Sequence, residues 1–162
     1  MNPTLRKITV PAYVILGAAL MMPSAWAENS CHNVQGQIIQ VVSDTTSTTF
    51  SGPVTKAGHL NGTAASTFFG PPFPTNEPNT FSFTFNMTIT TRDGALQAQF
   101  VNLFDNGTGV NTAQGRIDPN ARTGRFAGVT GILFLNGTAS SSSPFTVQLD
   151  LSGKICNDRE LE

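Results

Sequence analysis

Histidine side chains are the groups of this chain best suited to acid–base chemistry. The sequence contains two of them, His32 and His59, and histidine is the side chain that titrates closest to neutral pH. His32 adjoins a cysteine and His59 lies among turn residues, so we expect both to be ordinary surface groups. The sequence contains no G-x-S-x-G elbow, phosphate-binding loop, H-E-x-x-H helix or paired-cysteine metal site. We therefore predict no metal site and no cofactor, and we assign no catalytic residue.

Three arginines form a small basic group around a glycine-rich stretch late in the chain. They are Arg116, Arg122 and Arg125, and Asp118 lies between the first two. Arginine suits the bidentate recognition of carboxylates, so the group is a candidate contact for an anion or a carboxylate. The alternative, which we favour, is a set of surface charges paired with Asp118.

The N-terminal segment predicts export from the cytoplasm. Arg6 and Lys7 precede an apolar run at 13–22, and the small-residue pattern of a cleavage site follows at 25–27. The apolar run is too short for a comfortable membrane span, which argues against a retained anchor. We expect a signal peptide at 1–27 and a single domain at 28–162, secreted or periplasmic, with no stable membrane anchor after cleavage.

The composition of the 135 residues that follow the predicted signal peptide excludes some classes of partner and of ligand-binding barrel. They carry seven basic and ten acidic side chains, so there is no polycationic surface and we expect no nucleic-acid partner. Tyr13 and Trp26 both lie in the predicted signal peptide, and the other aromatic side chains are twelve phenylalanines. Barrels that hold ligands with tryptophan, such as biotin-binding proteins and lipocalins, are therefore not matched.

Two cysteines, Cys31 and Cys156, stand near the two ends of the predicted domain. In an exported protein an even cysteine count predicts a disulfide. The alternatives are two free thiols or a metal pair with His32, and a metal needs more ligands than the sequence offers. A bridge between these positions would place the first and last strands side by side.

Strand-like runs dominate the sequence between the cysteines. Residues 79–92 alternate strictly between apolar and polar side chains, which is the period of a half-buried strand. Residues 36–50, 95–104 and 144–155 show β-branched or alternating patterns. In a small barrel the apolar face of each strand points inward. We therefore predict a lumen wall, which would contact a ligand, at six side chains: Phe81, Phe83, Phe85, Met87, Phe100 and Phe134.

Turn signals separate these runs. Asp93-Gly94, Asn106-Gly107 and Asn136-Gly137 each predict a turn. Residues 105–111 fit a hairpin better than a calcium loop, because they lack the acidic spacing and closing glutamate of such a loop. The proline-rich segment 68–79 predicts a loop across one end of the fold. Seven or eight short strands leave a sandwich or a barrel, and the joined ends favour a barrel, because closure removes exposed edges.

Residues 115–131 carry a glycine-rich motif, GRIDPNARTGRFAGVTG. The motif resembles the allene oxide cyclase and dirigent family, whose members carry a GGTG-x-F-x-x-A-x-G stretch late in the domain. It departs from that pattern at Ala121 and Arg122, where the family usually has two glycines. The resemblance implies a single antiparallel eight-stranded β-barrel with a largely apolar lumen. The match falls on six residues: Thr123, Gly124, Phe126, Ala127, Gly128 and Gly131.

We interpret this motif as a barrel corner. Gly124 would adopt a positive-φ turn, and Phe126 would insert into the barrel. Gly128 and Gly131 would allow sharp bending or close packing. Plant members of the family hold fatty-acid-derived or phenolic molecules, but their catalytic residues do not map here. The resemblance therefore transfers the fold better than the activity.

Two functions are compatible with such a barrel. The first is a non-catalytic binding or structural barrel, secreted or periplasmic, with a phenylalanine-rich lumen for a small hydrophobic ligand. The second is a cyclase- or isomerase-like enzyme that shapes its substrate, which predicts a buried Arg, Asp or Glu beside the phenylalanines. A third interpretation, an adhesin-like sandwich, would be excluded by a closed sheet. The sequence leaves open whether side chains fill the lumen, and it identifies neither the ligand nor the oligomeric state.

Overall fold

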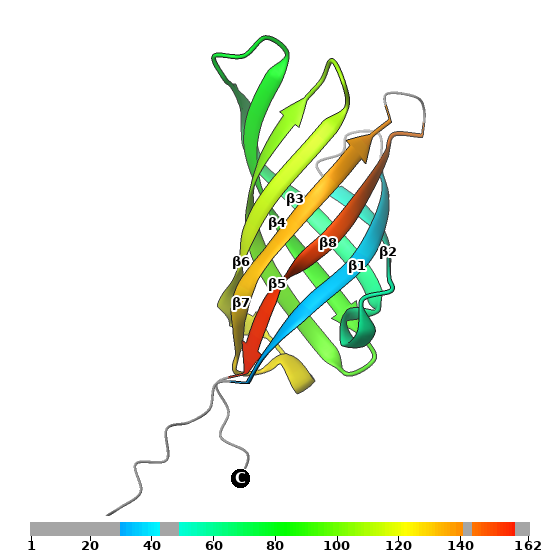
Figure 1. Cartoon of the computed structure of the whole chain (residues 1–162), viewed down its shortest axis with the longest axis vertical. Coiled ribbons are helices and arrows are strands. Elements are labelled where there is room, and N and C mark those ends of the chain that lie inside the picture. The colour runs from blue at the N-terminus through cyan, green and yellow to red at the C-terminus, as the bar shows by residue number, and fades with distance from the viewer. Residues whose placement is uncertain (1–29, 43–48, 141–143, 158–162) are drawn as a thin grey trace, which may run out of the picture.

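Eight antiparallel strands follow one another around a closed barrel, and the last strand is hydrogen-bonded to the first (Figure 1). The computed structural model describes residues 30–42, 49–140 and 144–157, so the predicted signal peptide lies outside the described residues. No helix within these ranges is long and apolar enough to cross a bilayer. The strands are β1 (Ser30–Val42), β2 (Thr49–Thr55), β3 (Gly62–Pro74), β4 (Thr80–Thr91), β5 (Gly94–Asp105), β6 (Val110–Arg122), β7 (Val129–Ala139) and β8 (Thr146–Asn157).

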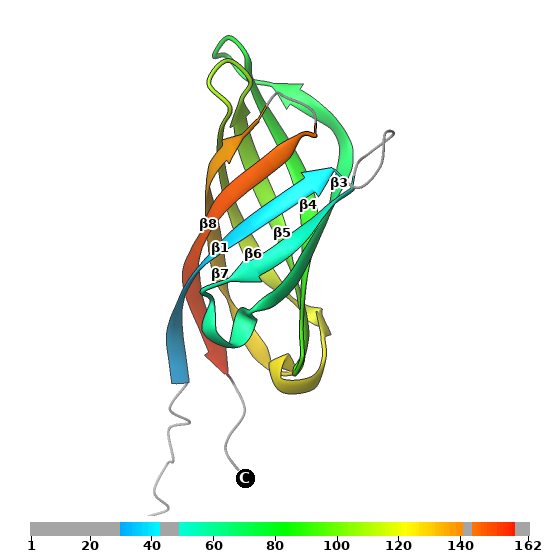
Figure 2. The same ribbon diagram turned by 90° about the vertical axis from the view of Figure 1, so that its right-hand side faces the viewer.

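The first and last strands close the barrel, as the two cysteines predict. β1 and β8 lie side by side along most of their lengths (Figure 2), and Cys31 faces Cys156 in their register. The two residues form a disulfide, a bond that persists in oxidising compartments. The closed sheet confirms the barrel prediction and excludes the sandwich.

Strand alternation builds one core along the barrel axis. Successive side chains of a strand point to opposite faces, so β4 turns Phe85, Met87 and Ile89 inward and buries them. This confirms the pattern predicted for 79–92. Every strand contributes to the core, for example with Ile38, Val54, Ala64, Met87, Phe100, Ile117, Leu133 and Leu149.

The two ends of the barrel carry different structures. At the disulfide end lie two short 3-10 helices, η1 (Gly58–Leu60) and η2 (Gly124–Phe126), together with the turn between β4 and β5 (Figure 1). At the opposite end, which we call the mouth, β3 joins β4 and β5 joins β6 (Figure 1). Turns at 92–93 and 106–108 connect the predicted hairpins.

The glycine-rich motif forms the connection between β6 and β7 at the disulfide end. Gly124 has a φ of +58° and Gly128 a φ of +83°, in the region that favours glycine. Between them, the Phe126 side chain is 5% exposed and packs into the core. A Cβ atom on Gly131 would lie 2.2 Å from the carbonyl oxygen of Lys154 on β8. The motif therefore turns the chain and allows close backbone packing.

Two local predictions, the loop at 68–79 and the turn at Asn136-Gly137, are wrong. Most of the segment expected to be a loop belongs to β3, and the ladder with β4 shifts between Phe69 and Phe73. Gly70, Pro71 and Pro72 form this irregularity, because proline cannot donate to the ladder. Asn136-Gly137 lies inside β7 and forms no turn. A Cβ atom on Gly137 would lie 1.9 Å from the Gln148 carbonyl oxygen, so close strand approach explains this glycine.

Candidate functional site

A pocket of about 320 Å³ lies at the mouth of the barrel. Its lining residues come from β2 to β8 or from the segment just before β8, so they surround the pocket. A volume near 300 Å³ is at the lower end of the range for small-molecule sites. The lining includes five phenylalanines and one asparagine: Phe50, Phe68, Phe83, Phe104, Phe145 and Asn111.

Phenylalanine rings continue from the mouth pocket into the middle of the barrel. Phe68 contacts Phe50 at 5.1 Å and Phe83 at 4.9 Å between ring centroids, both edge-on, which is a favoured arrangement for aromatic pairs. Deeper inside, Phe85 and Phe100 stack with centroids 5.0 Å apart. Both deeper rings are buried. The lumen is therefore filled in its middle and hollow at the mouth.

Two asparagines near the mouth have buried amide atoms without a hydrogen-bond partner in the described part of the chain, and one of them, Asn102, is among the residues of the outer hollow on β4 to β7. Asn102 is 1% exposed, and its partner in the β4–β5 ladder is the pocket residue Phe83. Neither polar side-chain atom of Asn102 has a hydrogen-bond partner within the described part of the chain, and the same holds for the buried Oδ1 of Asn111. Burying an unpaired amide is unfavourable, so these groups are the unusual feature of the mouth.

Gln40 and Ser66 show the arrangement that buried polar groups usually adopt. Gln40 Nε2 donates to Ser66 Oγ at 3.0 Å, and Ser66 Oγ lies 3.2 Å from Gln40 Oε1. Both side chains are buried. This pair satisfies its own polar atoms, in contrast to Asn102.

Asp105 begins the turn between β5 and β6 at the mouth. A hydrogen bond from the Thr108 side chain lowers the pKa of the Asp105 carboxyl, and a further one from the Gly107 backbone N–H, at 2.8 Å, acts in the same direction. The carboxylate thus organises a hairpin turn, as predicted for 105–111. The turn holds the end of β5 that carries Phe104.

The six predicted lumen residues take different places. Phe83 lines the mouth pocket, Phe81 is half-buried at the same end of β4, and Phe85, Met87 and Phe100 are buried below it. The prediction for Phe134 is wrong, since its side chain is 40% exposed on the outer surface. Its neighbours Leu133 and Leu135 point inward, and strand alternation therefore turns Phe134 outward.

Several pocket residues were missed by the sequence analysis. Phe68 belongs to the segment expected to be a loop, and Phe50 stands at the end of a run that splits into two strands. Phe104 continues the inward face that contains Phe100. Alternation along β5 could have found Phe104, although it would not have distinguished a pocket from a filled core.

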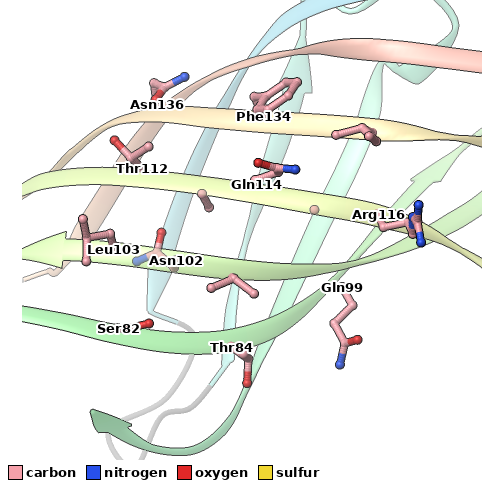
Figure 3. Close-up of a pocket in the computed structure, with 14 residues that line it drawn as sticks. Ser82, Thr84, Gln99, Asn102, Leu103, Thr112, Gln114, Arg116, Phe134 and Asn136 are labelled. Carbon is pink, nitrogen blue, oxygen red and sulfur yellow. The ribbon is translucent and has the colours of Figure 1, made fainter. Parts of the chain in front are cut away.

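A larger hollow of about 840 Å³ lies on the outer surface of β4 to β7. Figure 3 shows side chains from these strands on this face, with Phe134 on β7 and Gln114 on β6. Arg116 lies at one side of the hollow (Figure 3). The hollow lies over a single sheet surface, so it would contact a small molecule from one side only. We therefore take the mouth pocket as the candidate site.

The three arginines have different surroundings. Arg116 lines the outer hollow. Arg122 donates to the carbonyl oxygens of Pro119 and Val129, and thereby ties together the connection between β6 and β7. Arg125 lies 3.0 Å from Nδ1 of His59, and it lines a pocket at the disulfide end. The anion contact remains a prediction.

Asp118 and His32 are the other charged or titratable residues that the sequence analysis considered. The Asp118 carboxylate accepts from the backbone N–H of Asn120 at 2.8 Å. His32 is exposed and lines the same pocket as Arg125. The described residues contain no group of three or more His, Cys, Asp or Glu that could hold a metal ion.

Comparison with known proteins does not identify a relative of this chain. No family model, curated protein or solved structure matches the chain. The functional argument therefore rests on the mouth pocket and on the residues around it.

Proposed function

We propose that the protein is a secreted or periplasmic binding barrel whose mouth pocket takes a small hydrophobic molecule. The observation that carries this proposal is the ring of five phenylalanines around a pocket of about 320 Å³. Such a lining removes apolar ligand surface from water on several sides. The disulfide supports a site of action in an oxidising compartment.

The enzyme alternative depends on a buried charged group, and the described part of the chain contains none. Its buried polar side chains are Gln40, Ser66 and Asn102. Acid–base catalysis needs a titratable group within reach of the substrate. Binding is therefore the function that the site supports best.

We also propose distant membership of the allene oxide cyclase and dirigent family. The eight-stranded antiparallel barrel and the buried Phe126 between two positive-φ glycines support this assignment. It carries over the fold, whereas the ligand has to be established on this chain.

Titration with N-phenyl-1-naphthylamine, an uncharged fluorescent probe of apolar sites, tests the binding function. Ala139 lines the mouth pocket, and Ala139→Phe should fill it and lower the affinity at least tenfold. Ala65 is exposed on β3, so Ala65→Phe is the matched control and should leave the affinity unchanged.

A third variant distinguishes the mouth pocket from the outer hollow. Gln114 lies in that hollow (Figure 3), and Gln114→Phe should not change probe binding. Loss of binding in Gln114→Phe but not in Ala139→Phe would place the ligand on the outer surface and overturn the proposal. Thermal unfolding of each variant verifies that the barrel is intact.

A further inference from the structure

We infer that the disulfide end of the barrel binds a small organic carboxylate, and that Arg125 contacts the carboxylate group. The site is a pocket of about 350 Å³, a volume at the lower end of the range for small-molecule sites. The stacked rings of Phe85 and Phe100 fill the barrel between this pocket and the mouth. The inference therefore goes beyond the proposed function and does not depend on it.

Five elements surround this pocket. Its lining residues come from η1 and the residue before it, and from β1, η2, β7 and β8. The two 3-10 helices lie at this end of the barrel, beside the ends of the strands (Figure 2). His32 on β1 is the ladder partner of Ile155 on β8, and directly opposed partners present their side chains on the same face. A small molecule in the pocket would therefore be contacted from several sides, unlike one in the outer hollow.

Basic side chains line the pocket, and none of the described residues in its lining is acidic. Arg125 is the one permanently charged side chain among them, and His32 and His59 can each carry a positive charge. The Arg125 guanidinium lies against the His59 ring, with Nη1 3.0 Å from Nδ1 and Nη2 3.3 Å from Nε2. Two groups that attract an anion thus lie side by side in one pocket.

Arg125 has no carboxylate partner among the described residues. Its backbone N–H donates to the carbonyl oxygen of Asp93, whereas the Asp93 carboxylate pairs with Arg92. The contacts of its guanidinium are with the His59 ring, which carries no negative charge. A guanidinium has five N–H donors in a planar fork that matches a carboxylate. The positive charge of Arg125 is therefore available to an anion from solution.

The lining fits a singly charged anion with an apolar body. One permanent positive charge balances one carboxylate, whereas a phosphate monoester carries close to two negative charges. Val34 and Ile155 are half-buried in the lining, so they offer apolar surface to the rest of the molecule. These two features together indicate a carboxylate attached to a small hydrocarbon or aromatic group.

Benzoate and benzamide test the inference, because they have nearly the same shape and differ in charge. The chain contains two histidines and both line this pocket, so NMR spectra of the untagged protein with isotope-labelled histidine report on this site. Benzoate should shift the His59 ring signals until they saturate. Benzamide should bind about tenfold more weakly, the difference expected when a hydrogen bond between charged groups is lost.

Arg125→Gln should weaken benzoate binding by about tenfold or more, for the same reason. Arg92→Gln is the matched control, because Arg92 is paired with Asp93 and does not line the pocket. It removes the same charge from the same end of the barrel and should leave benzoate binding unchanged. Thermal unfolding verifies that each variant retains the barrel.

Three results would overturn the inference: no saturable shift of the histidine signals with benzoate, equal binding of benzoate and benzamide, or an unchanged affinity in Arg125→Gln. Displacement of N-phenyl-1-naphthylamine by benzoate without a shift of the histidine signals would place benzoate in the mouth pocket and would also overturn it. Failure of N-phenyl-1-naphthylamine to bind would instead overturn the proposed function and leave this inference standing.

Discussion

The ring of Phe100 on β5 lies against the backbone of Gly115 on β6, and a Cβ atom at residue 115 would lie 2.5 Å from the ring. The two residues are partners in the β5–β6 ladder. Phe85 stacks on the same ring. Because residue 115 lacks a side chain, the two large rings can lie across the lumen and close it beneath the mouth pocket.

Gly115→Ala should destabilise the barrel. The added methyl group would push the Phe100 ring out of its position, and overpacking of this kind costs about 1–3 kcal/mol. The free energy of unfolding in urea measures the effect. Gly107→Ala is the control, because its Cβ would meet first a side-chain oxygen of Asp105 at 3.2 Å. Equal losses in the two variants would contradict the packing role of Gly115.

Reduction of the disulfide should lower the free energy of unfolding without preventing barrel closure. Cys31 and Cys156 are 125 residues apart. For such a long loop the chain-entropy relation gives an upper limit of about 4–5 kcal/mol for the loss in free energy of unfolding. Denaturant unfolding with and without reductant measures it. The Cys31→Ser/Cys156→Ser double variant should match the reduced protein and be insensitive to reductant. Identical stability of the oxidised and reduced forms would refute this expectation.

Ser66→Ala should destabilise the core by about 1–3 kcal/mol, because it removes the hydrogen-bond partner of the buried Gln40 amide. Gln40→Leu removes the amide itself. In a double-mutant cycle the combined variant should lose less stability than the sum of the two single variants. Strict additivity would mean that the two side chains do not depend on each other.

Asp105 should make the stability depend on pH in the acid range. Its pKa is lowered in the folded protein, so the unfolded chain binds the proton more readily. The stabilisation is present in full above the usual carboxyl pKa and is lost as the pH falls through the lowered value. Unfolding measured across the acid range should show a shallower pH dependence for Asp105→Asn. Asp150→Asn controls for removal of a surface charge, and an unchanged profile in Asp105→Asn would refute the role of Asp105.

The barrel and its closure could be predicted from local sequence patterns. The strict alternation at 79–92 identifies β4 because a half-buried strand has a period of two residues. Cys31 and Cys156 predicted the pairing of β1 with β8, because a disulfide requires its two residues to be neighbours in space. These inferences need no knowledge of the other strands.

Tertiary structure decided which inward side chains line a pocket and which fill the core. The run around Phe134 is apolar on both faces, so its period could not show which face points inward, and only the pairing of β7 with β6 and β8 turned Phe134 out. Alternation places both Asn102 and Phe100 inward, but their surroundings depend on the register across the closed sheet. That register sets Phe100 over Gly115 and Asn102 beside Phe83. The filled middle and the open mouth pocket therefore follow from how neighbouring strands align, which no single strand encodes.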